Sequence, residues 1–302
     1  MTDTNYYVGV DIGTTSTKAV LFGDHGKVIQ MQHVEYPLYS PAPSIAEQDP
    51  DEIFQAVLHS IREVIRQAAI DSAKIQLVSF SSAMHSLILV DDKGKPLTRC
   101  ITWADSRATK WADKIKKELN GLEIYKRTGT PIHPMSPLAK ITWLKSDHHE
   151  LFAKASKFIG IKEYVFYKLF HEYIIDYSIA SATGLFNLEQ LAWDKEALQV
   201  AGISEAQLSK PVPTTFVKRG LKQELAAELG LSPDTPFIIG ASDGVLSNLG
   251  VGAIDPGVVA VTIGTSGAIR TVTNRPVTDP KGRIFCYALT ENHWVVGGPV
   301  NN

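Results

Sequence analysis

Short apolar runs separated by polar breaks open this 302-residue chain. Three runs rich in strand-favouring residues cover residues 6–13, 16–23 and 28–36. Between Ile53 and Ala68 the apolar positions change to a helical spacing. Asp49 followed by Pro50 is typical of a helix start, because the Asp carboxylate accepts hydrogen bonds from the first backbone N–H groups and Pro lacks one. The pattern predicts three strands followed by a helix.

Helical and strand patterns alternate over the rest of the chain. Apolar, strand-favouring runs recur in IQLVSFSSA (75–83) and in PFIIGASDG (236–244), where a strand runs into a loop. Helical patterns occupy about 106–119, 137–147, 159–170, 194–201 and 222–229. Strands followed by alternating helices and strands predict an α/β fold, with a mixed sheet flanked by helices.

Composition narrows the class of protein. The hydrophobic fraction of 44%, the charged fraction of 21% and the net charge of −2 are those of a globular protein. A near-neutral charge argues against nucleic acid or an anionic membrane as the main partner. No apolar run approaches the roughly 20 residues that span a bilayer, and MTDTNYY lacks the layout of a signal peptide. We expect a cytoplasmic protein in which Cys100 and Cys286 are buried, reduced thiols.

The break between the first two strands has an unusual composition. Gly13, Thr14, Thr15 and Ser16 offer backbone N–H groups and hydroxyls, which together suit an anion such as a polyphosphate. Asp11 just before them would repel phosphate unless a divalent cation such as Mg²⁺ lay between. Neither GxxxxGK[ST] nor GxGxxG is present, which excludes the P-loop and Rossmann modes. The alternative is an ordinary hairpin whose threonines favour strand.

The same arrangement recurs late in the chain. VVAVTIGTSGAIRTV (258–272) again places an apolar strand, Ile-Gly-Thr-Ser and a second strand in succession. Its central residues, Gly264, Thr265 and Ser266, correspond to those of the first hairpin. Two such hairpins, one in each domain, could face each other across a cleft.

Three further segments carry candidate chemistry. GASDG supplies Asp243 as an acid–base residue beside an acceptor hydroxyl, although a lone Asp among glycines is usually a turn residue. WADSR combines an aromatic ring, a carboxylate and a guanidinium, which suits a polyhydroxylated acid and equally suits a structural Asp–Arg pair. SSAMHS ends a strand at Met84 and His85, where a histidine is more often structural than a ligand.

Taken together, DIGTTSTK, WADSR, GASDG and TIGTSG resemble, in this order, the motifs of the FGGY carbohydrate kinases. The resemblance extends over essentially the whole chain, through segments such as RTGTPIHPMSPLAKITWL. It implies the actin-like, ribonuclease-H-like ATPase fold with two similar domains. It also implies ATP as a substrate and Mg²⁺ as a cofactor.

The resemblance assigns a role to each candidate residue. Asp243 would be the catalytic base, and Asp11 would approach the metal and the phosphates. Lys18 falls where related glycerol kinases carry an arginine near the transferred phosphate. The other positions form the first phosphate loop (Gly13, Thr14, Thr15), the second phosphate loop (Gly264, Thr265, Ser266) and the sugar pocket (Met84, His85, Trp103, Asp105, Met135).

The resemblance implies ATP-dependent phosphorylation of D-gluconate at its terminal hydroxyl as the expected reaction. Glycerol kinases have Arg-Glu where this chain has Met84-His85, which favours a sugar or a sugar acid. Xylulose kinases share the Met-His pair, so a kinase for xylulose or another pentulose or polyol is the alternative. A non-catalytic sugar sensor or an actin-like assembly ATPase is a further alternative. The expected partners are a sugar acid and ATP, and the resemblance allows a homodimer.

Members of this family continue beyond the position of Asn302. We therefore expect residues 1–251 to form the N-terminal domain and residues 252–302 to begin a second domain that is incomplete. The adenosine-binding segment would lie outside the chain. We expect exposed apolar surface near its end, together with weak ATP binding and negligible activity of these 302 residues alone.

Overall fold

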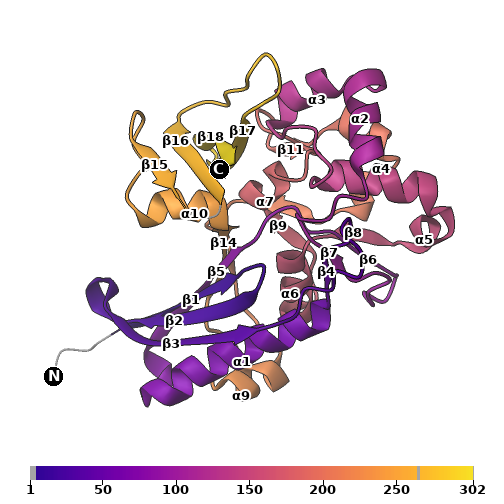
Figure 1. Cartoon of the computed structure of the whole chain (residues 1–302). Coiled ribbons are helices and arrows are strands. Elements are labelled where there is room, and N and C mark those ends of the chain that lie inside the picture. Colours follow the sequence, from indigo (N-terminus) through magenta and orange to yellow (C-terminus); the bar gives the residue numbers. More distant parts are fainter. Residues whose placement is uncertain (1–4, 264–265, 302) are drawn as a thin grey trace.

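A six-stranded mixed sheet carries the N-terminal part of the chain. The computed structural model describes residues 5–263 and 266–301 and orders these strands β13-β14-β5-β1-β2-β3 (Figure 1). Their bounds are β1 Tyr6–Ile12, β2 Ser16–Phe22, β3 Val28–Glu35, β5 Ile75–Ser82, β13 Val217–Lys218 and β14 Phe237–Ser242. Strands β1 to β3 are the three predicted strands and form an antiparallel meander, while β5 and β14 extend the sheet in parallel.

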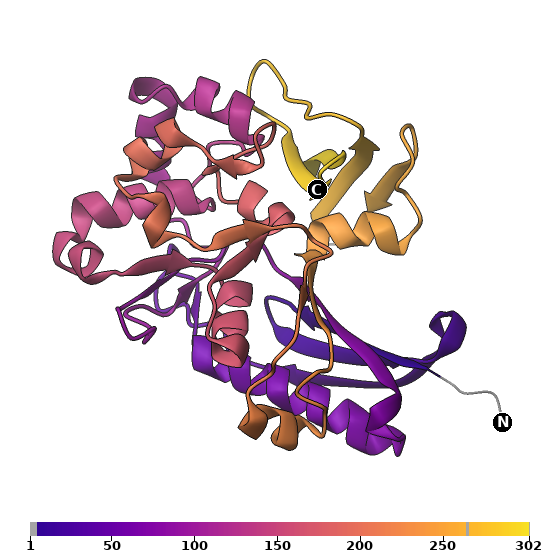
Figure 2. The ribbon, with the colours of Figure 1, turned by 180° about the vertical axis from the view of Figure 1, so that it is seen from behind.

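Helix α1 (Pro50–Ala68) covers one face of this sheet, and α9 (Gln223–Leu229) lies beside it in both views (Figures 1 and 2). The predicted N-cap is confirmed, because Asp49 Oδ1 accepts a hydrogen bond of 2.9 Å from the Asp51 amide. Val57, Ile61 and other apolar residues of α1 are buried against the apolar side of the sheet. Burial of this stripe, rather than helix propensity, holds α1 in place.

Short helices and two-stranded sheets form the middle of the chain. The helices are α2 (Thr109–Glu118), α3 (Gly121–Thr128), α4 (Pro137–Asp147), α5 (His149–Lys154), α6 (Ile161–Phe170), α7 (Tyr177–Ser181) and α8 (Lys195–Ala201). The strand pairs are β4 (Glu47–Gln48) with β7 (Cys100–Ile101), β6 (Ile88–Val90) with β8 (Lys157–Ile159), β9 (Ile174–Asp176) with β12 (Lys210–Val212), and β10 (Phe186–Asn187) with β11 (Ala192–Trp193). The sequence did not predict α3, α5 or α7, which are too short to show a clear period.

A second, four-stranded sheet ends the described chain. Its strands lie in the order β15-β16-β18-β17 and are all antiparallel. The bounds are β15 Val259–Thr262, β16 Ser266–Thr273, β17 Phe285–Thr290 and β18 His293–Asn301. Val272, Tyr287 and Val295 pack on β14 and on helix α10 (Asp243–Gly250). Apolar side chains remain exposed nearby, as expected, at Val251, Val259, Val261, Ile263 and Ile269.

Within the described ranges, no helix is both long enough and apolar enough to cross a bilayer. Cys100 and Cys286 are both buried and free, as the sequence predicted. Burial raises the pKa of each thiol to about 12, so neither is a reactive thiolate at neutral pH.

Gly240 lets β14 pass close to β5. Its φ is +65°, and a Cβ added there would lie 1.7 Å from the carbonyl oxygen of Phe80. The pairing of β14 with β5 changes register between Ile238 and Ala241, which is typical of a bulge next to a functional site. Only glycine fits this bend, which brings Asp243 to the end of the sheet.

We expect Gly240→Ala to lower the free energy of unfolding by at least about 3 kcal/mol, because it combines a backbone clash with an unfavourable φ. Gly230→Ala is the matched control, since Gly230 has a φ of +67° with no atom within 4 Å of an added Cβ. It should cost only about 1 kcal/mol. Urea unfolding of both variants measures the difference, and equal losses would contradict the steric role of Gly240.

Candidate active site

One pocket gathers predicted residues from segments far apart in the sequence. Its volume is about 440 Å³, and it opens where the end of β5, the turn after β1, the loop before α2 and the start of α10 meet. It is lined by Thr14, Ala83, Met84, His85, Trp103, Met135, Asp243, Gly244, Ser247, Thr262 and Arg270. Hollows of 520 to 560 Å³ occur elsewhere on the described surface, but they contain none of the predicted site residues. The site is therefore identified by its chemistry and not by its size.

Asp243 is the first residue of α10, so the predicted loop is in fact a helix start. Ser242 caps the helix by accepting a hydrogen bond from the Val245 amide, and Gly244 N–H donates to Asp243 Oδ1 at 2.6 Å. Asp243 is exposed to solvent in the pocket, so the burial that acts on its pKa is partial. Burial raises its pKa above the usual value, and the nearby Asp11 carboxylate adds to the rise. A carboxylate with a raised pKa suits a general base.

The first predicted phosphate loop lies between β1 and β2. Tyr36 Oη donates a 2.7 Å hydrogen bond to the Gly13 carbonyl, and the Gln48 side-chain amide donates to the Thr14 carbonyl at 2.6 Å. These bonds hold the carbonyl oxygens of the loop. No hydrogen bond among the described residues uses the amide N–H of Thr14 or Thr15. Both donors are therefore available to an anion.

Asp11 faces this loop from the end of β1. Its Oδ1 atom is buried without a hydrogen-bond partner among the described residues. Lys18 lies directly opposite Asp11 on β2 and is exposed. No group of three or more His, Cys, Asp or Glu side chains suited to a metal occurs in the described part of the chain. A cation that one carboxylate holds together with phosphate oxygens fits these residues.

His85 forms part of the wall opposite the loop. Its φ is +66°, which is rare for a residue other than glycine, and its Nδ1 lies 2.7 Å from the Ala182 carbonyl oxygen. Burial, with a smaller contribution from the Lys140 charge, lowers the pKa of His85 to about 3. The ring is therefore neutral, with Nδ1–H donating to Ala182 and Nε2 left as an acceptor.

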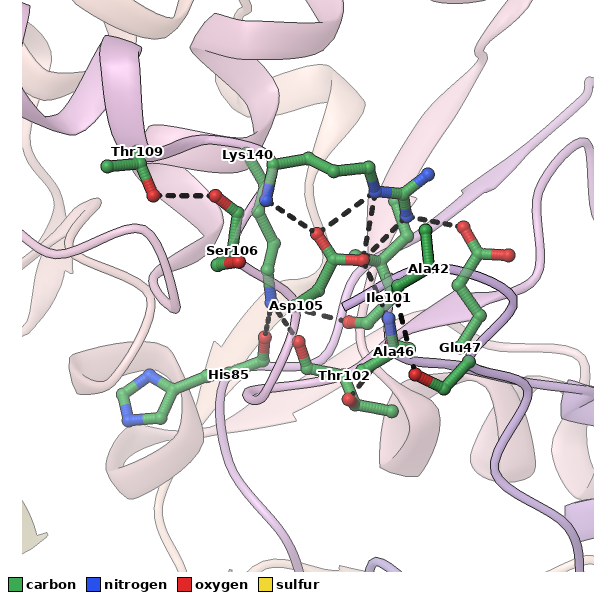
Figure 3. Close-up of polar contacts among 12 residues, drawn as sticks. Ala42, Ala46, Glu47, His85, Ile101, Thr102, Asp105, Ser106, Thr109 and Lys140 are labelled. Atoms are coloured by element: carbon green, nitrogen blue, oxygen red, sulfur yellow. Dashed lines mark hydrogen bonds and ion pairs between the residues drawn. The ribbon is translucent and has the colours of Figure 1, made fainter. Parts of the chain in front are cut away.

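Lys140 of α4 fixes the backbone behind this wall. Its buried ammonium donates to the carbonyl oxygens of His85 (2.7 Å), Thr102 (2.7 Å) and Ile101 (3.3 Å), as Figure 3 shows for the first two. Burial lowers the pKa of Lys140 to about 7, and Asp105 opposes this effect. The network connects the strand end at His85 with the loop that carries Trp103.

Trp103 joins the two sides of the pocket. Its side chain is 49% exposed, and its indole Nε1–H donates a 3.0 Å hydrogen bond to Thr14 Oγ1 in the phosphate loop. Met135 lies just before α4 and contributes a second apolar surface. An indole face and a thioether suit the C–H faces of a sugar chain.

Asp105 was predicted to line the sugar pocket, but the structure places it behind the pocket wall. The residue is 1% exposed. Its carboxylate accepts from Arg107 Nε at 2.9 Å and from the Ala46 amide at 3.1 Å, and Arg107 also pairs with Glu47 (Figure 3). Because these contacts use its oxygens, we now interpret Asp105 as a positioning residue for the Trp103 loop.

Comparison with known proteins agrees with this geometry. Residues 6–250 match the N-terminal domain of the FGGY family of carbohydrate kinases. The chain belongs to this family. It is 61% identical over 299 residues to the gluconokinase of Bacillus subtilis (strain 168), and the match covers 99% of this chain and 58% of that relative. The chain thus spans less than two thirds of the length of this FGGY kinase.

Two solved FGGY structures from Lactobacillus acidophilus superpose closely. A ligand-bound xylulose kinase is 43% identical with a TM-score of 0.95, and a gluconate kinase is 42% identical with the same score. Each match covers 99% of this chain and 60% of the solved chain. The likeness confirms the expected actin-like α/β fold with its mixed sheet.

Sequence reasoning missed some residues at or behind the pocket, and some predicted residues cannot be placed. Arg270, Ser247 and Lys140 carried no local signal beyond strand or helix patterns. Gly264 and Thr265 of the second predicted phosphate loop lie outside the described residues, and for Ser266 only the strand backbone is described. Their predicted role, like that of Lys18, stays a prediction.

We expect Asp105→Asn to lower the free energy of unfolding by about 1.5 to 3 kcal/mol, because the buried Asp105 carboxylate is a charged hydrogen-bond acceptor of the half-buried Arg107, which would keep only Glu47 as an ionic partner. Asp113→Asn is the control, since Asp113 is exposed, and it should change stability by less than about 0.5 kcal/mol. Thermal and urea unfolding measure both. A stable Asp105 variant with a raised KM for the sugar would instead support the original prediction of a substrate contact.

Proposed function

We propose that the protein containing this chain transfers the γ-phosphate of ATP to the terminal hydroxyl of D-gluconate, giving 6-phosphogluconate. The observation that carries the proposal is the pocket, which brings the carboxylate of Asp243, with its raised pKa, to the same space as Thr14 of the phosphate loop. The name of the Bacillus subtilis relative supports gluconate as the acceptor. The adenosine-binding residues are not assigned to this chain.

Asp243 would accept the proton of the attacking hydroxyl. Its raised pKa brings it nearer to neutral pH, where a base both stays ionised and accepts a proton readily. The hydroxyl oxygen then bonds to the γ-phosphorus as the bond to the β,γ-bridging oxygen breaks in line. The amide N–H groups of Thr14 and Thr15 would stabilise phosphate charge on the donor side.

We propose that Asp11 holds Mg²⁺ together with the phosphates, because its buried Oδ1 has no described partner and suits a hard cation. Bound Mg²⁺ would neutralise negative charge on the transferred phosphate. Lys18 and the second hairpin, through Gly264, Thr265 and Ser266, would add donors on the same side. We also propose a cytoplasmic location, and the homodimer stays a prediction.

Met84, His85, Trp103 and Met135 would hold the sugar chain. The neutral His85 has Nε2 as an acceptor, which lies 3.5 Å from the Tyr287 hydroxyl, and a sugar hydroxyl would take the place of that long contact. Thioether and indole groups cover the carbon chain and exclude water, which would otherwise compete as the phosphate acceptor. The bond from Trp103 to Thr14 ties this sugar wall to the phosphate loop.

A kinase for xylulose is the second candidate. The Lactobacillus acidophilus structure named as a xylulose kinase is as similar to this chain as the one named as a gluconate kinase. A non-catalytic sugar sensor or an assembly ATPase is less well supported, because neither requires a base, a sugar wall and a phosphate loop in one pocket.

Asp243→Asn should lower kcat of the full-length protein about 10²- to 10⁴-fold, because the amide of Asn cannot accept the proton of the attacking hydroxyl. Gluconate binding should change little, since the amide keeps the size and one acceptor oxygen. Asp234→Asn, at an exposed position, is the control and should keep wild-type kcat. A coupled ADP-release assay and calorimetry measure these effects, and substantial turnover by the Asp243→Asn variant would remove Asp243 from the role.

A panel of acceptors tests the substrate. The full-length wild-type protein should show a higher kcat/KM for gluconate than for xylulose, ribulose or glycerol. ADP release in the absence of any acceptor should be slow by comparison. A preference for xylulose would favour the second candidate, and acceptor-independent hydrolysis would favour the assembly ATPase.

A further inference from the structure

Arg270 is a cation in the pocket that forms no ion pair with a described carboxylate. It projects from β16, and its guanidinium makes one described side-chain hydrogen bond, from Nη1 to Thr262 Oγ1 at 3.1 Å. Its Nε atom is buried and has no partner, and no salt bridge among the described residues involves it. A guanidinium carries five N–H donors, so most of them remain available.

Arg107, Arg127 and Arg283 differ in this respect. Each pairs with a carboxylate oxygen at 2.7 Å in the same structure. Burial lowers the pKa of Arg270, and Asp243 only partly opposes this effect. Holding a partly desolvated cation without an ion-pair partner is unfavourable, and such a group gains from a ligand that brings the opposite charge.

The neighbours of Arg270 indicate which part of the pocket it serves. A Cβ added at Gly244 would lie 3.0 Å from Met84 Cε and 3.7 Å from both Nε and Nη2 of Arg270. Tyr287 is close enough to interact electrostatically with Arg270, and its hydroxyl lies 3.5 Å from His85 Nε2. Arg270 therefore belongs to the wall formed by Met84 and His85. The first phosphate loop enters the pocket from the turn after β1, at Thr14.

We propose that Arg270 binds the carboxylate of the sugar acid and so selects an acidic acceptor over a neutral one. This inference rests on the proposed function and names the residue that sets its specificity. The planar guanidinium can donate two parallel N–H···O bonds to a carboxylate, a geometry that a neutral polyol cannot match. The remaining source of a similar anion is the transferred phosphate of ATP, and the experiment separates the two.

The test compares Arg270→Gln with the wild type in the full-length protein, using gluconate and D-glucitol, a six-carbon polyol without the carboxylate. We expect kcat/KM for gluconate to fall about 10- to 100-fold, which is the loss of a hydrogen bond to a charged group. The inhibition constant of glucitol and the KM for ATP should change less than about twofold. Arg270→Lys keeps the charge but loses the planar pair of N–H donors, so its kcat/KM for gluconate should lie between those of the wild type and the Gln variant.

Arg275→Gln is the matched control, because Arg275 is an exposed arginine at the end of the same hairpin. It should leave all three constants unchanged. Circular dichroism and thermal unfolding check that each variant is folded. If the Gln variant does not fold, the Lys variant tests the inference in its place.

Two results would overturn the inference while leaving the proposed function intact. One is an equal loss for every acceptor together with a raised KM for ATP, which would assign Arg270 to the phosphate. The other is a folded Gln variant with wild-type selectivity. If the wild-type protein itself does not use gluconate, the proposed function fails first, and the inference fails with it.

Discussion

The pocket depends on the buried ammonium of Lys140. A buried ammonium is tolerated only where acceptors replace its water, and here three backbone carbonyls do so, at His85, Ile101 and Thr102. Those carbonyls belong to two segments that pair with each other at Leu87–Ile101 and at Val90–Pro96. Lys140 joins the ends of these two segments that lie at the pocket. One end carries Met84 and His85, and the other carries Trp103. The unusual left-handed backbone of His85 persists because its carbonyl oxygen and its ring are both held.

A second buried lysine acts in the same way behind β14, the strand that ends just before Asp243. Lys162 of α6 pairs with Asp176 at 2.6 Å and donates to the carbonyl oxygens of Ile239 and Ala241 on β14. Asp176 in turn caps α7 through the Ser178 amide, and Ser178 Oγ accepts from the Ser242 amide. A buried lysine thus ties the segments at His85 and Thr102 to α4, and another ties β14 to α6. We expect rigid support of this kind to keep the proposed donors and the proposed base in position.

Local patterns in the sequence predicted the first three strands, α1 and its cap, because strand-favouring runs, helical period and capping are properties of neighbouring residues. The motifs also predicted which segments meet, since Thr14, Met84, Trp103 and Asp243 do share one pocket. The role of an individual carboxylate at the pocket could not be predicted from these motifs. Asp105 stands two residues from Trp103, yet its oxygens are used by Arg107 and by the distant Ala46 amide. Lys140 was hidden for a similar reason, because its acceptors come from other segments.

Charge is distributed unevenly between the two ends of the pocket. At the end formed by the predicted phosphate loop, Asp11 keeps a buried oxygen without a described partner, which suits a cation. At the Met84 end, Arg270 keeps a buried N–H group without a described partner, which suits an anion. Asp243 lies between the two, and its pKa responds to both, since Asp11 raises it and Arg270 lowers it. Filling the Asp11 end with a metal would remove the repulsion that raises this pKa, whereas pairing Arg270 with a carboxylate would remove the attraction that lowers it. A metal at Asp11 and a carboxylate at Arg270 would therefore shift the pKa of Asp243 in opposite directions.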